Sequence, residues 1–494
     1  MKLKRTLSLV LAFLMAVSVM AGCSGSSSSS TAAEGGDSGA ASSSGTTSAD
    51  SGEPVYGGTV VVAYTQEPDT MNVYSTHLLA DVQTCMIEGL LIPDQDMNYV
   101  PVLAKEVPTV ENGLIQLTDD GKMTITYNLK EGVKWHDGEP FTSADVKYTW
   151  EALYDENFIA EGKDGVYDIE KIECPDDYTV VCYYKYPVAD YATTLFTFGI
   201  LPKHVCEGTD LNEQTGYNVA PIGTGPYKFK EWKQGEYIEL VANEDYHEEG
   251  KPYLDGIIFK MIPDANTQLT QFKTGEVNFL MNMPFDMYEE LQTIEGTTVE
   301  AARQNAWTTI DFNLSDPIIG DKAVRQAISL CTNTDAIINQ LFYGLPQACN
   351  SVWMPFDTYH NPDLPAHEYN PEKAAQILEE AGWVDTDGDG IREKDGQKLE
   401  IEFQARTDVD DDLKIQQVIM EECKQVGISM TADNAASATQ SARWFDGDFQ
   451  MNIHRWITGS PSRTRFYSAN NIPPDGNNTV RYVNEELTQL LEES

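Results

Sequence analysis

Basic and aromatic side chains gather near the C-terminal end of this sequence. Residues 446–467 include one histidine, three arginines and a tryptophan: His454, Arg455, Arg463, Arg465 and Trp456. A guanidinium group can form paired hydrogen bonds with a carboxylate or phosphate, and an indole ring can form the wall of a ligand site. The segment therefore suits a ligand with an anionic group. The alternative, slightly favoured, is that the arginines neutralise acidic side chains on the nearby surface.

An acidic motif further upstream begins like a calcium-binding loop. Asp385, Asp387 and Asp389 alternate with other residues and precede Gly390. Such a loop requires a bidentate glutamate at its twelfth position, and here that position is Gly396. We therefore interpret the motif as a polar turn and predict no metal site.

Two other motifs could suggest catalysis or phosphate binding. His136 and Asp137 could transfer protons, but they fall on an expected hairpin turn and have no identifiable nucleophile partner. The segment from Gly223 to Pro226 lacks the lysine and hydroxyl of a phosphate loop. Pairs of carboxylates carry no information in a chain with 78 acidic residues. The sequence predicts no catalytic residue and no cofactor, so we do not expect an enzyme.

Eight cysteines occur in the chain, and the first of them, Cys23, belongs to the N-terminal segment. The other seven are Cys85, Cys174, Cys182, Cys206, Cys331, Cys349 and Cys423. An odd number in an exported chain leaves at least one thiol unpaired within the molecule, and spacing does not reveal the pairing. No Cys-x-x-Cys spacing occurs, so neither a zinc site nor a redox motif is expected.

The N-terminus has the composition of a secretory signal. Three basic residues precede a largely apolar run of 14 residues, Leu7 to Met20, which is too short to span a bilayer. The block Met20-Ala21-Gly22-Cys23 resembles the bacterial lipobox, in which the cysteine becomes the lipidated first residue of the mature protein. This resemblance implies a signal peptide over residues 1–22 and lipidation of Cys23. The alternative is an ordinary cleavable signal with a chance cysteine.

Residues 24–53 consist almost entirely of serine, glycine, alanine and threonine. Such a segment has too little apolar surface to offset the entropy of ordering it. We therefore expect residues 23–53 to form a lipidated cysteine and a flexible tether, with a span on the order of 30 Å. No later stretch reaches 18 consecutive apolar residues. The expected location is extracytoplasmic, with the lipid on the outer face of the cytoplasmic membrane, or periplasmic.

The chain is strongly acidic. Its formal net charge is -45, and loss of residues 1–22, which hold three basic residues and no acidic one, makes it -48. Nucleic acid and anionic lipid headgroups repel such a protein, so neither is an expected partner. We interpret the acidity as solvation rather than recognition of a cationic ligand. The chain after Glu53 exceeds one ordinary domain, so at least two lobes are expected.

Short strands and helices alternate along the chain. The pattern predicts strands at Val60–Tyr64, Thr124–Leu129 and Val133–His136. Thr142 is expected to cap a helix, with Asp145 completing a capping box.

The C-terminal half predicts more helices. Pro371 opens one whose apolar positions include Ala374 and Leu378, and Gly382 ends it. Residues 321–340 predict one or two others. The interleaving of strands and helices indicates an α/β or α+β fold.

Seven short blocks are distinctive in combination and cover most of the chain after Glu53: Gly57–Thr59, Glu67–Asn72, Leu129–Gly138, Pro221–Tyr227, Ile262–Thr267, Val324–Ile328 and Tyr369–Ala374. In this order they resemble family 5 of the bacterial extracellular solute-binding proteins. That group includes binding proteins for dipeptides, oligopeptides and nickel complexes. Each block alone is a weak signal, but their ordered combination is specific.

The resemblance implies an α/β fold with two lobes, a periplasmic-binding-protein-like clamp of the cluster C type. The first lobe is expected to comprise residues 54–80 and 195–300. Residues 81–194 are expected to form an extra subdomain inserted in it, and residues 301–494 the second lobe.

The segment Arg303–Phe312 resembles the crossing between the lobes. Family members usually continue beyond the block that resembles Tyr482–Leu487 and return to the first lobe. This chain stops at Ser494, so we expect a truncated second lobe; a naturally short variant is the alternative.

In peptide-binding relatives a Trp-x-x-Asp motif supplies a carboxylate for the ligand's α-amino group. Trp456 is present here, but Gly459 stands where the acidic residue is expected. A peptide therefore remains the default ligand, although the acidic residue that would bind its α-amino group is absent. An anionic solute is the alternative that the nearby arginines suggest.

The resemblance implies ligand-binding residues in both lobes. They are Gln66, Glu67, Pro68, Asp69, Trp307, Trp456, Thr458, Gly459, Arg463 and Arg465. For residues 66–72 a plain turn between strand and helix is almost as good an interpretation, and Trp456 has a core position as its alternative.

The implied function is that of the solute-binding protein of an ABC importer. Such a protein captures a small ligand, by default a peptide, between its lobes and delivers it to a membrane permease. The expected partners are the ligand and the permease subunits, with the membrane contacted only through the lipid, and a monomer is expected. A surface peptide receptor is the alternative, and a secreted hydrolase is more remote.

Overall fold

The computed structural model describes residues 54–494 except 77–80, 95–97, 161–162, 164, 190, 194–195, 303, 305, 356–358, 458–462, 475 and 494. The expected signal peptide, the lipidated Cys23 and the tether lie outside the described residues. The same holds for Arg303, Thr458 and Gly459.

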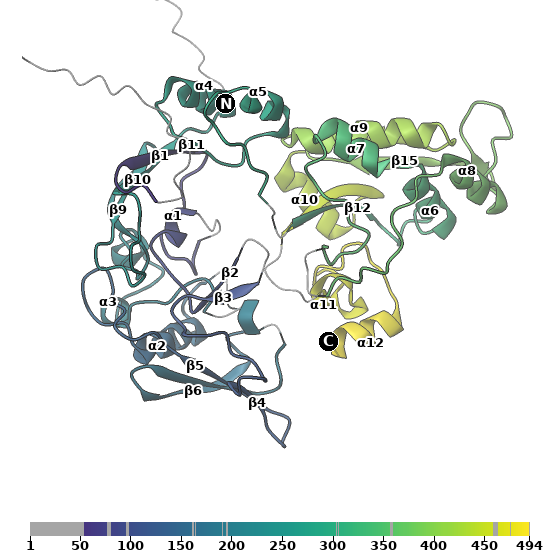
Figure 1. The fold of residues 1–494 in the computed structure, drawn as a ribbon. Helices are drawn as coiled ribbons and strands as arrows, with labels where there is room; N and C mark the ends of the chain where they lie inside the picture. Colours follow the sequence, from purple (N-terminus) through teal and green to yellow (C-terminus); the bar gives the residue numbers. More distant parts are fainter. Residues whose placement is uncertain are drawn as a thin grey trace, which may run out of the picture. The chain divides into compact units, whose positions relative to one another are not determined.

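A five-stranded sheet lies in the part of the chain before residue 300 (Figure 1). Its strand order is β11 (Phe279–Leu280), β1 (Thr59–Tyr64), β10 (Gly256–Met261), β9 (Tyr237–Ala242) and β8 (Tyr227–Lys233). Strand β1 runs parallel to both β10 and β11, while β10, β9 and β8 pair antiparallel. The sheet therefore joins segments that are about two hundred residues apart in sequence.

A four-stranded antiparallel sheet is formed by residues 115–184. Its order is β4 (Ile115–Leu117), β5 (Met123–Asn128), β7 (Thr179–Tyr184) and β6 (Ile169–Asp176). Helix α2 (Ser143–Tyr154) begins at the expected capping box of Thr142 and Asp145 and buries Val146 and Leu153. Side chains of this sheet and of the five-stranded sheet belong to one hydrophobic core, which extends from Val62 to Phe259.

The smaller elements before residue 300 connect these two sheets or flank them. They are α1 (Asp81–Thr84), β2 (Leu91–Pro93), β3 (Tyr99–Pro101), α3 (Lys203–Cys206), α4 (Ala265–Thr274) and α5 (Tyr288–Gln292).

A second four-stranded sheet is built by residues 306–457. Its order is β12 (Ala306–Phe312), β17 (Met451–Ile457), β15 (Glu400–Gln404) and β16 (Ser429–Ala432). Strands β12 and β17 are antiparallel, whereas β15 runs parallel to both β17 and β16.

Helices cover both faces of this sheet (Figure 1). Helices α6 (Lys322–Cys331), α7 (Thr334–Leu341), α8 (Pro371–Glu380) and α9 (Asp410–Lys424) contribute to the core on one face. Helix α10 (Ser437–Asp446) contacts the opposite face through Gln440 and Trp444. The hairpin of β13 (Glu393–Lys394) and β14 (Gln397–Lys398) and helices α11 (Thr464–Tyr467) and α12 (Glu485–Glu493) complete this part.

The buried residues of this second sheet and its helices form a core of their own, from Ile318 to Ile453. No buried residue belongs both to this core and to the core of residues 62–259. The described chain therefore has two main hydrophobic centres, as a protein with two lobes requires. The lobe boundaries given above stay a prediction.

Most of the helices and strands predicted from the sequence are present, and one predicted strand is not. The two helices within residues 321–340 exist, and α8 starts at Pro371 and ends before Gly382, whose φ is 88°. The strand expected at Val133–His136 is reduced to a single bridge between Lys134 and Pro140. The Trp135 N–H donates to the Glu139 carbonyl at 2.8 Å and the Phe141 N–H to the Val133 carbonyl at 3.0 Å, so the chain turns back within a few residues and the pairing stays short. The His136 N–H, beyond this pairing, donates to the Gly223 carbonyl at 2.9 Å.

Among the described helices, none combines the length and the apolar character needed to cross a membrane.

Candidate ligand site on the second sheet

Strands β12 and β17 pair in a register that gives the sheet two different faces. Residues opposite each other on antiparallel strands point to the same side of the sheet, and successive residues alternate sides. Ile310 pairs with Ile453 and Phe312 with Met451, and these side chains contribute to the second core. The other face carries Trp307, Thr309, Asp311, Asn452, His454 and Trp456. We call this set the polar face.

Aromatic rings contact one another across the polar face. Trp307 and Trp456 occupy opposite positions in the strand pair, with ring centres 6.4 Å apart and planes inclined by 28°. The His454 ring lies 4.7 Å from Trp456. Trp444 of α10 stacks on His454 at 3.9 Å, and Phe466 of α11 lies 4.4 Å from Trp456. The two candidate tryptophans are thus brought together in one aromatic cluster.

Asp311 is a buried carboxylate beneath these rings. It is only 7% exposed and accepts hydrogen bonds from the Thr309 hydroxyl at 2.8 Å and the Trp444 Nε1 at 3.0 Å. Burial penalises the charged form and raises the pKa of Asp311 to about 6, although both hydrogen bonds oppose this rise. Near neutral pH this group is a buried anion held by two neutral donors.

His454 has the opposite tendency. Burial lowers its pKa to about 4, and the charge of Arg406 lowers it further. Arg406 itself is bound to Asp412 through two hydrogen bonds, of 2.6 and 2.9 Å. The imidazole is therefore neutral at physiological pH, with one nitrogen protonated and the other able to accept.

Several buried polar atoms of the polar face and α10 have no hydrogen-bond partner among the described residues. They are Trp307 Nε1, His454 Nδ1, Gln440 Oε1 and Asn452 Nδ2. Leaving such an atom unpaired costs about 1–3 kcal/mol. Gln440 and Asn452 are 1% and 0% exposed and lie between α10 and β17, so these two amides belong to the packing of the helix on the sheet. The Trp307 Nε1 donor and the His454 Nδ1 acceptor are the pair that a ligand with amide groups could match. Unpaired buried polar groups are often found at sites that bind a polar ligand.

The two candidate arginines lie in different environments. Arg463 is 1% exposed; its guanidinium lies 4.9 Å from the Trp307 ring centre and 5.8 Å from that of Trp353. Its Nε donates to the Val352 carbonyl at 3.1 Å. Arg465, by contrast, is exposed. Arg463 thus supports Trp307 by a cation–π contact, and only Arg465 is open to solvent.

The candidate loop of the first lobe makes its contacts within that lobe. Glu67 accepts hydrogen bonds from Trp232 Nε1 and from the Gly235 backbone N–H, both at 3.0 Å. Asp69 accepts from the Thr76 hydroxyl at 2.6 Å. Gln66 and Asp69 are exposed, and Pro68 is buried. The Glu67 carboxylate therefore anchors the loop on the turn between β8 and β9.

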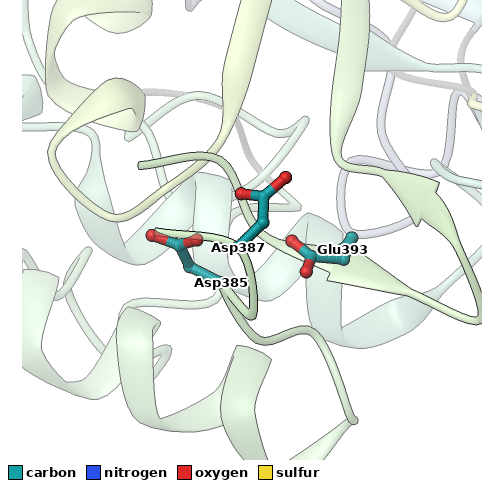
Figure 2. A group of neighbouring side chains, drawn as sticks. All are labelled: Asp385, Asp387 and Glu393. Atoms are coloured by element: carbon teal, nitrogen blue, oxygen red, sulfur yellow. The ribbon is translucent and has the colours of Figure 1, made fainter. Parts of the chain in front are cut away.

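The acidic motif at residues 385–393 forms a turn whose carboxylates already have partners. Asp385 accepts from the backbone N–H groups of Gly388 and Gly390, and Lys398 pairs with Asp387 at 3.6 Å. Ligand atoms of Asp385, Asp387 and Glu393 lie within 4.8 Å of one another (Figure 2). This spacing could accommodate a cation, but the hydrogen bonds are those of a turn.

The sequence-predicted candidates Trp307, Trp456 and Arg463 lie together in the structure, and their role in binding stays a prediction. Asp311, Gln440, Trp444 and Asn452 were missed. One signal existed: Gln440 and Trp444 are four residues apart on a helix, so they share a face, but nothing local shows which strand this face meets.

Comparison with known proteins places the chain among binding proteins. Residues 98–478 match the family described as bacterial extracellular solute-binding proteins, family 5 Middle. The oligopeptide-binding protein AppA of Bacillus subtilis is 31% identical over 519 residues, which cover 100% of this chain and 88% of AppA.

Solved structures agree with this match. AppA of Bacillus subtilis, solved in complex with a nonapeptide, has a TM-score of 0.67 at 30% identity, covering 89% of this chain and 87% of AppA. NikA of Brucella suis, solved with Fe(III)-EDTA, has a TM-score of 0.72 at 23% identity, covering 88% of this chain and 90% of NikA. The expected two-lobed α/β binding-protein fold is confirmed, and so is the family resemblance.

Proposed function

Because this chain belongs to family 5 of the bacterial extracellular solute-binding proteins, we propose that it captures a peptide for import. It would enclose the peptide between its lobes and deliver it to the permease of an ABC transporter. Family members bind solutes rather than transform them, so no catalytic step is part of this role.

The observation that carries the peptide assignment is the polar face of β12 and β17. It combines aromatic walls with buried, unpaired atoms of both kinds, the Trp307 Nε1 donor and the His454 Nδ1 acceptor. A peptide offers both N–H and C=O groups in fixed alternation, so it can pair with donors and acceptors together. The similarity to AppA over the whole chain supports the same ligand class.

The proposed contacts come from both lobes. In the second lobe they involve Trp307, Trp456 and Arg465, with Arg463 behind Trp307, and the segment of Thr458 and Gly459. In the first lobe they involve the loop of Gln66, Pro68 and Asp69, which Glu67 anchors. Closure on the ligand would derive its energy from tighter binding in the closed state.

Binding can be tested with the full chain in a thermal-shift screen followed by calorimetry. The probes are unrelated peptides of four to nine residues, free amino acids and a nickel–histidine chelate. A ligand that binds only the folded state raises the melting temperature, so peptides should raise it and free amino acids should not.

The outcomes separate the alternatives. Stabilisation by the chelate but by no peptide would replace peptide with a metal complex as the ligand class. Cleavage of the peptides during the assay would contradict a binding protein and support a hydrolase. A response to peptides that requires a free carboxylate would favour the anionic-group hypothesis.

The export route is part of the proposal. We propose that Cys23 carries the lipid, that the protein faces the outside of the cytoplasmic membrane and that it acts as a monomer. Replacing Cys23 by alanine should move the protein from the membrane fraction to the soluble fraction. Mass spectrometry of the wild-type N-terminus tests the modification directly, and an unmodified Cys23 would exclude the lipid anchor.

A further inference from the structure

Two buried cysteines of the second core are in contact. Cys331 is the last residue of α6, and Cys423 lies in the last turn of α9. They are 1% and 0% exposed, and their sulfur atoms are 3.3 Å apart. Both helices pack on the same side of the second sheet and share one core.

We propose that Cys331 and Cys423 form a disulfide in the exported protein, linking the C-terminal ends of α6 and α9. A disulfide bond is about 2.05 Å long, so the sulfur atoms must approach by roughly another 1.3 Å. An approach of that size is on the scale of a side-chain rotation. The family places the chain outside the cytoplasm, where disulfides persist.

The bond forms by thiol–disulfide exchange with a disulfide oxidant. The thiolate of one cysteine attacks the oxidant, which gives a mixed disulfide and releases one thiol. The second cysteine then attacks the mixed disulfide and releases the second thiol. The two cysteines lose two protons and two electrons in total, and the oxidant is reduced to two thiols.

The burial of this pair determines when the bond forms. The contact with Cys331, together with burial, raises the pKa of the Cys423 thiol well above its ordinary value. The thiolate is the reactive species, so the folded core exchanges slowly. The link is therefore made during folding after export, before α6 and α9 close over it.

The link should stabilise the second lobe. It joins residues that are 92 positions apart, and long loops gain most from a crosslink in the chain-entropy description. For a lobe of about 190 residues, the melting temperature should rise by about 5–10 °C.

The test uses the full chain isolated from membranes without reductant, with free thiols blocked by iodoacetamide under denaturing conditions. Peptide mass mapping should find a crosslinked pair of peptides that contain Cys331 and Cys423, and dithiothreitol should separate them. Alkylation of both cysteines in the exported protein would overturn the proposal. A link found only after refolding with oxidised glutathione would overturn it as well.

Matched variants test the stabilising effect. C331A and C423A should each remove the difference in melting temperature between oxidised and reduced protein. The control is the double variant C174A/C182A on the neighbouring strands β6 and β7, which should retain that difference. A difference that persists in C331A, or that disappears in the control, contradicts the proposal. Mapping of the unmodified chain decides the matter even if a variant fails to fold.

Discussion

The loop of residues 66–72 and the polar face of β12 and β17 differ in whether their polar side chains have hydrogen-bond partners. In the loop, Glu67 accepts hydrogen bonds from Trp232 and Gly235. On the polar face, Trp307 Nε1 and His454 Nδ1 are buried without a partner among the described residues. The loop contributes its shape, whereas the polar face has hydrogen-bonding capacity left over.

The two regions of the proposed site would therefore meet a ligand in different ways. A loop whose carboxylate is already used is preorganised and costs little to order when a ligand arrives. Unpaired buried polar atoms raise the free energy of the protein without ligand. A ligand that supplies hydrogen-bond partners removes this unfavourable contribution. Specificity for the hydrogen-bonding groups of a ligand should therefore reside in the second lobe.

The largest expected effect concerns the pH dependence of stability. Two titrating groups of the polar face change the stability in opposite directions as the pH rises. The pKa of Asp311 is raised to about 6, so the folded protein binds its proton more tightly and loses stability as pH rises from about 4 to about 6. The pKa of His454 is lowered to about 4, so its contribution is lost as pH falls from about 6.5 to about 4. The two effects nearly cancel in the wild type.

Replacing either group should make the pH dependence of the other group measurable. His454→Phe keeps a stacked ring, and its stability relative to the wild type should fall by about 3 kcal/mol between pH 4 and pH 7. Asp311→Asn should show the opposite slope. Urea denaturation at several pH values measures both. The first-lobe His136, whose pKa is also lowered to about 4, is unchanged in every variant and cancels from the comparison. Unaltered slopes in both variants would contradict this account.

The next effect concerns peptide affinity. Trp456→Ala removes an indole that contacts Trp307, His454 and Phe466, so the peptide Kd should rise by about 30-fold, equivalent to about 2 kcal/mol. The control is Trp232→Phe in the first lobe, which keeps an aromatic ring against the core and loses the hydrogen bond to Glu67. Calorimetry should find the control within about twofold of the wild type. Equal losses in both variants would remove the distinction between the lobes.

A smaller effect tests the anchored loop. Glu67→Ala leaves Trp232 Nε1 and the Gly235 N–H without their acceptor and should cost about 1–2 kcal/mol of stability. Glu67→Gln retains an oxygen that can accept both bonds and should restore most of it. Peptide affinity should change little in either variant. A loss of affinity without a loss of stability would instead place Glu67 in direct contact with the ligand.

The smallest effect concerns Arg465. Its side chain is exposed, and exposed ion pairs contribute little. Arg465→Ala should weaken binding of a peptide with a free C-terminal carboxylate by about twofold and leave the amidated peptide unaffected. Competition binding with the two peptides measures this. Equal weakening for both forms would show that Arg465 does not recognise the anionic group.

Local signals in the sequence predicted individual elements well. The capping box of Thr142 and Asp145 starts α2, and Pro371 and Gly382 bound α8, because these residues act on the backbone within one turn. The strand expected at Val133–His136 is only a bridge, because the turn at Gly138 limits the pairing to a few residues and His136 bonds instead to Gly223, 87 residues further along the chain.

For the site, the sequence determined which side chains were available: Trp307, Trp456, Arg463 and Arg465, on segments that resemble the family. Only the tertiary structure decided what surrounds each of them. Trp307 meets Trp456 because β12 and β17 pair in one register, and Asp311 meets Trp444 across 133 residues. A shift of that register by one residue would move these side chains to the other face of the sheet. Burial then shifts the pKa values of Asp311 and His454, because the cost of charge depends on surroundings that distant segments supply.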